Sequence, residues 1–204
     1  MVNKAVSTAI GSVVFASGAT MLGFAAPAMA QDFTGVYAGL SGALPFDSEM
    51  TYNYNQTDDL SGVAPGFFTG YNTDLGGWII GAEVAFNGGM DLDDIDGAGI
   101  DNMVDLKAKF GRVFGNAYVY GILGYSKGDP NTGIYGDYAK GVDAEGMNYG
   151  LGVETMLKGN AFVGLELLSR DLEVGGTVYG GDADPYYVGI DKLTTASVRI
   201  GFRF

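Results

Sequence analysis

The sequence predicts an all-β protein, an eight-stranded antiparallel up-and-down transmembrane β-barrel. Three observations lead to this fold class. The chain ends in a strand-like segment whose apolar side chains, from Val198 to Phe204, occupy every second position. Arg199 and Arg203 fall on the opposite face, so one face can meet lipid while the other carries charge. Similar segments recur along the chain, and long and short connections alternate between them.

Residues 1–30 have the composition of a secretory signal peptide. Lys4 is their only charged residue, a stretch of apolar and small residues follows, and Ala28–Ala30 fits the small-residue cleavage pattern. A membrane-spanning anchor is the alternative, but glycine, serine and threonine dilute the apolar run below the ~20 residues that a spanning helix needs. We therefore expect cleavage before Gln31, which leaves 31–204 as a single barrel domain.

The composition favours strands and narrows the choice of partners. The chain has 35 glycines, 5 prolines, 13 tyrosines and 12 phenylalanines, which suits twisted strands ringed by aromatic residues. There is no cysteine, so a disulfide framework is excluded. With 24 acidic and 11 basic residues the net charge is −13, and nucleic acid is therefore excluded as a partner.

Segments with a period of two, bounded by turn residues, predict eight strands. They are Thr34–Ala43, Val63–Asn72, Trp78–Phe86, Met103–Phe114, Ala117–Ser126, Met147–Leu157, Ala161–Asp171 and Leu193–Phe204. Their lengths suit the ~9–11 residues that a tilted strand needs to cross a membrane.

The connections between these strands alternate in length. The short ones are rich in glycine and asparagine and comprise Thr73–Gly77, Gly115–Asn116 and Lys158–Asn160. The long ones comprise residues 44–62, 87–102, 127–146 and 172–192. This alternation predicts a barrel in the outer membrane, with short periplasmic turns and long extracellular loops.

Each predicted strand has an apolar face and a face that carries the few charges. The apolar face of the third strand begins at Trp78 and ends at Phe86, as expected of a strand with an aromatic residue at each membrane interface. Glu83 lies on its other face. The fifth strand is ambiguous, because both the face of Tyr120 and the face of Leu123 are apolar.

The charged faces together place nine ionisable residues inside the predicted barrel. They are Glu83, Asp105, Lys107, Lys109, Glu154, Glu166, Arg170, Arg199 and Arg203. An eight-stranded barrel has about enough room for its own side chains, so these groups should pair with one another away from bulk water. We expect a structural network of ion pairs. A proton or ion path and a catalytic carboxylate pair are the alternatives.

Histidine is absent from the chain. A Ser-His or Asp-His catalytic pair therefore cannot be built, and a zinc site would lack both of its usual ligand types, histidine and cysteine. Carboxylate or lysine chemistry has no supporting motif either. We expect no enzymatic activity and no cofactor.

The second long connection contains the acidic segment Asp91–Gly97. It does not have the spacing of an EF-hand loop, because Ile95 and Asp96 occupy the fifth and sixth positions. Weak binding of Ca²⁺ or Mg²⁺ beside lipopolysaccharide phosphates stays open, but a solvated acidic loop is the commoner case. Further acidic residues in the long connections predict a negative outer rim. They are Asp47, Glu49, Asp58, Asp59, Asp129, Asp137, Asp143, Glu145, Glu173, Asp182, Asp184 and Asp191.

Five short patterns occur in a recognisable order. They are Phe33–Gly39, Gly70–Asn72 followed by Trp78–Glu83, Lys107-x-Lys109-x-Gly111, Gly150-x-Gly152-x-Glu154, and Val198-x-Ile200-x-Phe202-x-Phe204. In this order the chain resembles the small outer-membrane β-barrels of Gram-negative bacteria, the group that includes opacity-type and OmpA-membrane-domain-like porin-family proteins. The resemblance implies insertion by the outer-membrane assembly machinery. That machinery reads a last strand with a final aromatic residue, here the strand of Ile200, Phe202 and Phe204.

The resemblance implies no single activity. We expect a non-enzymatic integral outer-membrane protein with a structural or surface role in the cell envelope, surrounded by lipid and lipopolysaccharide. A small-solute pore is the alternative. A secreted, lipocalin-like carrier of a hydrophobic ligand is less favoured, because its apolar face would have to point inward.

Overall fold

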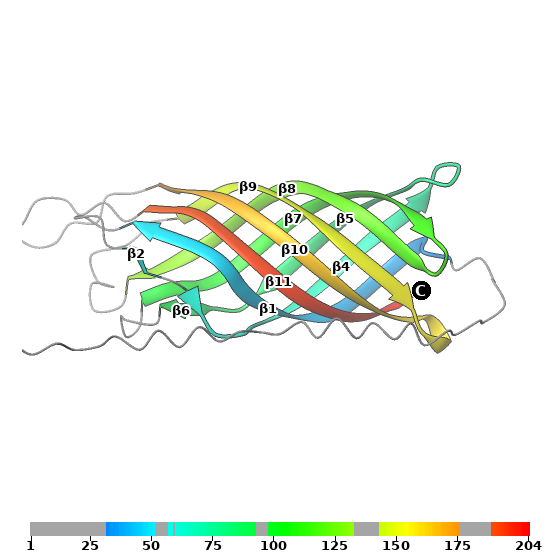
Figure 1. Cartoon of the computed structure of the whole chain (residues 1–204), viewed down its shortest axis with the longest axis horizontal. Coiled ribbons are helices and arrows are strands. Elements are labelled where there is room, and N and C mark those ends of the chain that lie inside the picture. Colours follow the sequence, from blue (N-terminus) through cyan, green and yellow to red (C-terminus); the bar gives the residue numbers. More distant parts are fainter. Residues whose placement is uncertain (1–31, 52–56, 59, 93–97, 133–142, 176–188) are drawn as a thin grey trace, which may run out of the picture.

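The computed structural model describes residues 32–51, 57–58, 60–92, 98–132, 143–175 and 189–204 (Figure 1). Eight long strands cross the molecule: β1 (Gly35–Thr51), β4 (Ala64–Asp74), β5 (Ile79–Asn87), β7 (Ala98–Phe114), β8 (Ala117–Thr132), β9 (Asp143–Met156), β10 (Ala161–Gly175) and β11 (Gly189–Arg203). The other elements within the described residues are three short strands, β2 (Thr57–Asp58), β3 (Leu60–Ser61) and β6 (Met90–Leu92), and one 3₁₀ turn, η2 (Lys158–Asn160). The predicted signal peptide and its cleavage site lie outside the described residues.

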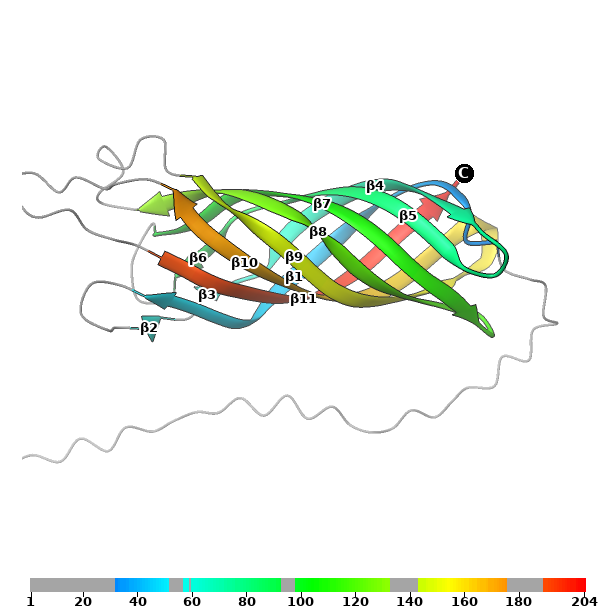
Figure 2. The same ribbon diagram turned by 90° about the horizontal axis from the view of Figure 1, so that it is seen from above.

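The long strands form a closed barrel. Each pairs antiparallel with the long strand that follows it along the chain, and β1 pairs with β11, where Tyr37 lies opposite Arg203. The backbone N–H of Phe204 donates to the carbonyl of Val36 at 2.8 Å, next to this seam. Figures 1 and 2 show the strands tilted around a common axis, with the short turns at one end. The predicted eight-stranded up-and-down barrel is confirmed.

Several strands are longer than predicted at the end opposite the short turns. β1 continues to Thr51 rather than Ala43, and β8 continues to Thr132 rather than Ser126. The backbone hydrogen bonds of an antiparallel pair do not require an apolar face, so pairing continues beyond the point where apolar alternation stops. Alternation therefore detects the lipid-facing part of each strand and misses its extension.

The two surfaces of the barrel wall differ as the alternation predicts. Leu151 and Leu40 face outward and are 65% and 64% exposed, whereas Arg199 faces inward and is 1% exposed. The structure also assigns the fifth predicted strand, since Tyr120 is buried inside and Leu123 lies on the outer surface. A carrier with an apolar lumen would need the opposite arrangement.

Aromatic residues gather toward both ends of the outer surface. Trp78 stacks on Phe110 near the short turns, with a centroid distance of 4.6 Å, and Phe67 stacks on Phe86 farther toward the long connections, also at 4.6 Å. Such pairs are typical of the interfacial girdles of a membrane barrel. Among the described residues, no helix is long and apolar enough to span a membrane.

Candidate functional site

The interior of the barrel is the candidate site, because charged side chains from five strands converge there. β5 contributes Glu83, β7 contributes Asp105, Lys107 and Lys109, β9 contributes Glu154, β10 contributes Glu166 and Arg170, and β11 contributes Arg199 and Arg203. None of these side chains is more than 5% exposed. The period of two places each of them on the inward face of its strand, and the closed barrel brings the strands together.

Seven of the nine form one connected set of ion pairs, which we call the central network. Its members are Glu83, Lys107, Lys109, Glu154, Glu166, Arg199 and Arg203. Glu83 contacts three cations, with its carboxylate oxygens 3.3 Å from Lys107 Nζ, 3.4 Å from Lys109 Nζ and 2.5 Å from Arg199 Nη2. It is therefore the carboxylate with the most ionic partners in the described interior.

The other two carboxylates extend the central network across the lumen. Glu166 lies 2.5 Å from Lys107 Nζ and also pairs with Arg199. Glu154 lies 2.9 Å from Lys109 Nζ and 3.1 Å from Arg203 Nη2. Every member except Arg203 contacts at least two oppositely charged members, so the network does not depend on a single pair.

Asp105 and Arg170 form a separate ion pair, which we call the outer pair because it lies nearer the long connections. Arg170 donates through Nε and Nη2 to the two oxygens of Asp105, at 2.9 and 2.7 Å. This fork is the strong bidentate geometry of a guanidinium and a carboxylate. Neutral groups complete the site, since Asn87 and Ser126 donate to Asp105 at 2.9 and 2.7 Å and Thr195 accepts from Arg170 at 2.9 Å.

Two tyrosines that the alternation of the sequence does not assign to the lumen belong to the same interior. Tyr37 donates its hydroxyl to Glu83 at 3.0 Å, and Tyr120 contacts Glu154 and Glu166 at 3.1 and 3.4 Å. Lys109 Nζ lies 3.9 Å from the centroid of the Tyr120 ring. The inward face of Tyr120 is ambiguous in the sequence, because an aromatic residue suits lipid and lumen equally well.

Phe33 is buried inside the barrel near the short turns. Its carbonyl accepts a hydrogen bond from Asn72 Nδ2 at 3.2 Å and another from Arg203. Its ring is buried and lies 5.5 Å from the ring of Tyr118. The segment that precedes β1 is thus attached to the central network through Arg203.

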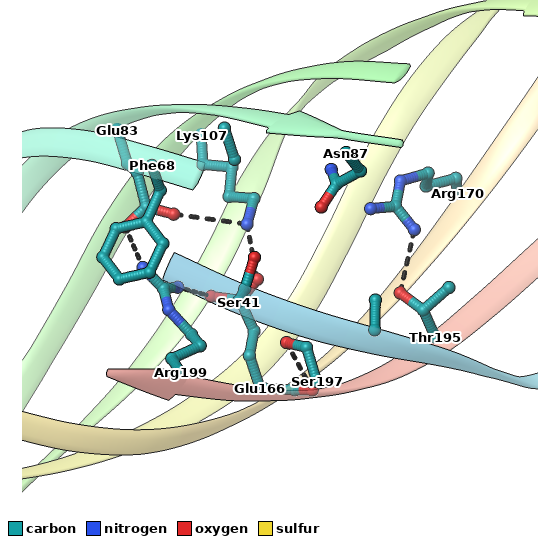
Figure 3. Close-up of a pocket in the computed structure, with 12 residues that line it drawn as sticks. Ser41, Phe68, Glu83, Asn87, Lys107, Glu166, Arg170, Thr195, Ser197 and Arg199 are labelled. Atoms are coloured by element: carbon teal, nitrogen blue, oxygen red, sulfur yellow. Dashed lines mark hydrogen bonds and ion pairs between the residues drawn. The ribbon is translucent and has the colours of Figure 1, made fainter. Parts of the chain in front are cut away.

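Little space remains between the central network and the outer pair. Figure 3 shows Glu83, Lys107, Glu166 and Arg199 pointing toward one another, with Arg170 beyond them. The cavity that these side chains line has a volume of about 10 Å³. That is close to the space that one water molecule requires, so at this level the side chains leave no room for a substrate.

The acidic long connections are only partly described. Residues 93–97 of the segment Asp91–Gly97 lie outside the described residues, as do Asp59, Asp137, Asp182 and Asp184. Asp143 pairs with Lys127 at 2.6 Å on exposed strand ends. Within the part of the chain that the structure describes, no three acidic side chains are arranged to hold a metal ion.

Comparison with known proteins identifies the family. Residues 16–204 match the family described as outer membrane protein beta-barrel domain. No curated protein matches the chain. Because the family match covers most of the sequence, the chain belongs to this family, and it is located in the cell outer membrane.

Solved structures show the same fold at low sequence identity. Ail, the attachment invasion locus protein of Yersinia pestis, solved in complex with the heparin analogue sucrose octasulfate, is 18% identical with a TM-score of 0.52, covering 84% of this chain and 99% of Ail. OprG from Pseudomonas aeruginosa is 17% identical with a TM-score of 0.54, covering 84% and 96%. AlkL, solved by solid-state NMR in DMPC bilayers, is 11% identical with a TM-score of 0.55, covering 88% and 95%.

Proposed function

We propose that this outer-membrane barrel is a non-enzymatic structural protein of the cell envelope, with a closed interior and an acidic outer rim. The observation that carries the proposal is the filled lumen, in which the central network and the outer pair leave a cavity of about 10 Å³. A hydrophilic solute would have to separate ion pairs that are buried from water. Leaving a buried charge without its partner costs about 3–5 kcal/mol, which would hinder passage strongly.

The proposal assigns the nine interior charges a structural role. Their pairing joins β5, β7, β9, β10 and β11 across the lumen, in addition to the hydrogen bonds between neighbouring strands. At the outer rim, exposed Asp129, Glu145 and Glu173 support a negative surface that resists self-association. We propose that these carboxylates are solvated.

Conductance measurements separate this proposal from a small-solute pore. The mature protein, reconstituted into planar bilayers, should show no steady open channel, and liposomes that contain it should not swell in small sugars. E83Q should lower the stability of the barrel without opening a channel, because its three cations keep other carboxylates. A steady large conductance in the unaltered protein would favour the pore instead.

We also propose that the last strand is the assembly signal. Ile200 and Phe202 of β11 and the following residue, Phe204, lie on the outer surface and are 54%, 56% and 79% exposed. F204A should lower the fraction of protein that resists detergent until boiled, whereas V198A on the same face should change it less. Equal loss in both variants would refute a special role for the final aromatic residue.

Secretion through an N-terminal signal completes the proposal. Cleavage before Gln31 predicts a mature protein whose mass corresponds to residues 31–204. Intact-mass measurement of protein recovered from outer membranes tests this directly, and recovery of a chain that keeps residues 1–30 would contradict it.

A further inference from the structure

The lipid-facing wall has an apolar groove near the short turns. It crosses β4, β5 and β7 and has a volume of about 470 Å³. The lining residues that the argument uses are Tyr71, Ile80, Ala82, Ala108 and Phe110. Ala82 and Ala108 lie opposite each other in the β5–β7 register, and their small side chains form the bottom of the groove. Tyr71 and Phe110 are each 54% exposed and form its sides.

An arginine lies beside the end of this groove that is nearer the short turns. Trp78 stacks on Phe110 with an interplanar angle of 9°, and the guanidinium of Arg112 lies 5.0 Å from the centroid of the Trp78 ring. The β5–β7 register pairs Ile80 with Phe110, which places Trp78 and Arg112 one step closer to the turn. Groove, tryptophan and arginine therefore form one continuous outer surface.

Arg112 differs from the basic residues of the lumen. Lys107, Lys109, Arg199 and Arg203 each contact a carboxylate of the central network, and Arg170 contacts Asp105. Arg112 is exposed and, among the described residues, forms no ion pair. The ring of Trp78 orients a guanidinium whose donors are open to an external anion, and a guanidinium fork suits the oxygens of a phosphate.

We propose that Arg112, Trp78 and the groove bind an anionic glycerophospholipid of the periplasmic leaflet. The phosphate lies at Arg112, at the level of the aromatic girdle where headgroups are found, and one acyl chain lies over Ala82 and Ala108. Lipid is the occupant because this face of the barrel is in the membrane and because the unpaired cation complements an anionic headgroup. The inference depends on the membrane location and not on whether the barrel conducts.

The chain contains a single tryptophan, Trp78, so the proposed site carries its own fluorescent reporter. The mature protein is folded into phosphatidylcholine vesicles that contain a small fraction of phosphatidylglycerol with brominated acyl chains, or of phosphatidylcholine with the same chains. Bromine quenches tryptophan at short range. We expect the quenching of Trp78 to give an apparent affinity about fivefold higher for brominated phosphatidylglycerol than for brominated phosphatidylcholine. This is the preference for an anionic lipid that one nearby arginine provides.

Matched variants assign that preference to the site. R112Q should bring the ratio of the apparent affinities for the two brominated lipids close to one. A108L places a larger side chain in the bottom of the groove and should lower this ratio. K158Q removes a basic residue in a short turn outside the site and should keep the ratio of the unaltered protein.

Three results would overturn the proposal. They are a ratio near one in the unaltered protein, an unchanged ratio in R112Q, and equal losses in R112Q and K158Q, which would indicate general surface charge. Gel mobility before and after boiling verifies that each variant is folded.

Discussion

The central network and the outer pair solve the same problem in different ways. Both hold ionised groups inside a barrel wall that faces lipid. In the central network Glu83 shares its charge among Lys107, Lys109 and Arg199, and each of these cations also has a second carboxylate. In the outer pair, Arg170 is the only basic side chain within ion-pair distance of Asp105 among the described residues, and neutral donors satisfy the remaining oxygen sites.

The difference teaches that burial alone does not determine how sensitive a charge is to mutation. When Glu83 is neutralised, each of its three former partners still contacts another carboxylate of the central network. When one member of an isolated pair is removed, the other is left buried and uncompensated, which is the costly case. Four variants test this comparison, from the largest expected effect to the smallest.

R170M should give the largest loss. It leaves Asp105 ionised, buried and without a cation, so the free energy of unfolding should fall by about 3–5 kcal/mol. Urea unfolding of the barrel in vesicles measures this change. The double variant D105L/R170M should recover much of the loss, because it removes both charges. If R170M lowered the free energy of unfolding less than E83Q does, the isolated pair would not be the more sensitive of the two charge groups.

E83Q should lower the free energy of unfolding by about 1.5–3 kcal/mol, the range for a hydrogen bond to a charged group, because it weakens three contacts without leaving any cation unpaired. Lys107 and Arg199 keep Glu166, and Lys109 keeps Glu154. The same urea titration applies. A loss equal to that of R170M would show that sharing gives no protection.

G152A should perturb the central network through Tyr120. A Cβ atom on Gly152 would lie 2.2 Å from Cζ of the Tyr120 ring, so the ring must move away from its contacts with Glu154 and Glu166. Crowding of this kind costs about 1–3 kcal/mol, and we expect about 1–2 kcal/mol here. G115A is an unsuitable control, because Gly115 has a φ of +64° and an alanine there would be strained. We therefore compare G152A with the milder variant Y120F. Y120F retains the ring position and should lose less stability.

D32N, outside both charge groups, should have the smallest effect. The hydroxyl and backbone N–H of Thr34 donate to Asp32 at 2.6 and 2.8 Å and lower the pKa of its carboxyl group. A lowered pKa stabilises the folded state above the unfolded value of about 4, and this contribution disappears as the pH falls through the folded value. For so exposed a group we expect at most about 0.5 kcal/mol at pH 7, and this difference should shrink as the pH falls below about 4. A difference that stays constant as the pH is lowered would exclude the ionic origin.

The barrel fold and the inward positions of the charged residues can be predicted from the sequence, but the ion-pair partners of these residues cannot. The alternation of apolar and charged residues is a property of each strand by itself. It is sufficient to place Glu83 and Arg199 on the inner side of the barrel wall. Their contact joins positions 116 residues apart and depends on barrel closure and on the register of every strand between them. The separation into a central network and an outer pair has the same origin, and no local pattern reports it.

The inward position of Tyr120 and the extensions of the strands could not be predicted from alternation, for different physical reasons. Tyr120 lies on a strand whose two faces are both apolar, so hydrophobicity could not indicate the lumen. The glycine opposite it, Gly152, leaves room for its ring. The strand extensions, such as β8 from Lys127 to Thr132, have no lipid-facing stripe. Backbone pairing holds them instead.

The seam between β1 and β11 sets a constraint on the time course of folding. The first long strand acquires one of its two neighbours only when residues 189–203 are present, because Tyr37 pairs with Arg203 and Leu40 with Ile200. An edge left open exposes unpaired amide groups, which hydrocarbon tolerates poorly. Translocated chain must therefore be kept from aggregating until its final hairpin arrives, and maturation should be slow and concerted rather than proceeding strand by strand during export.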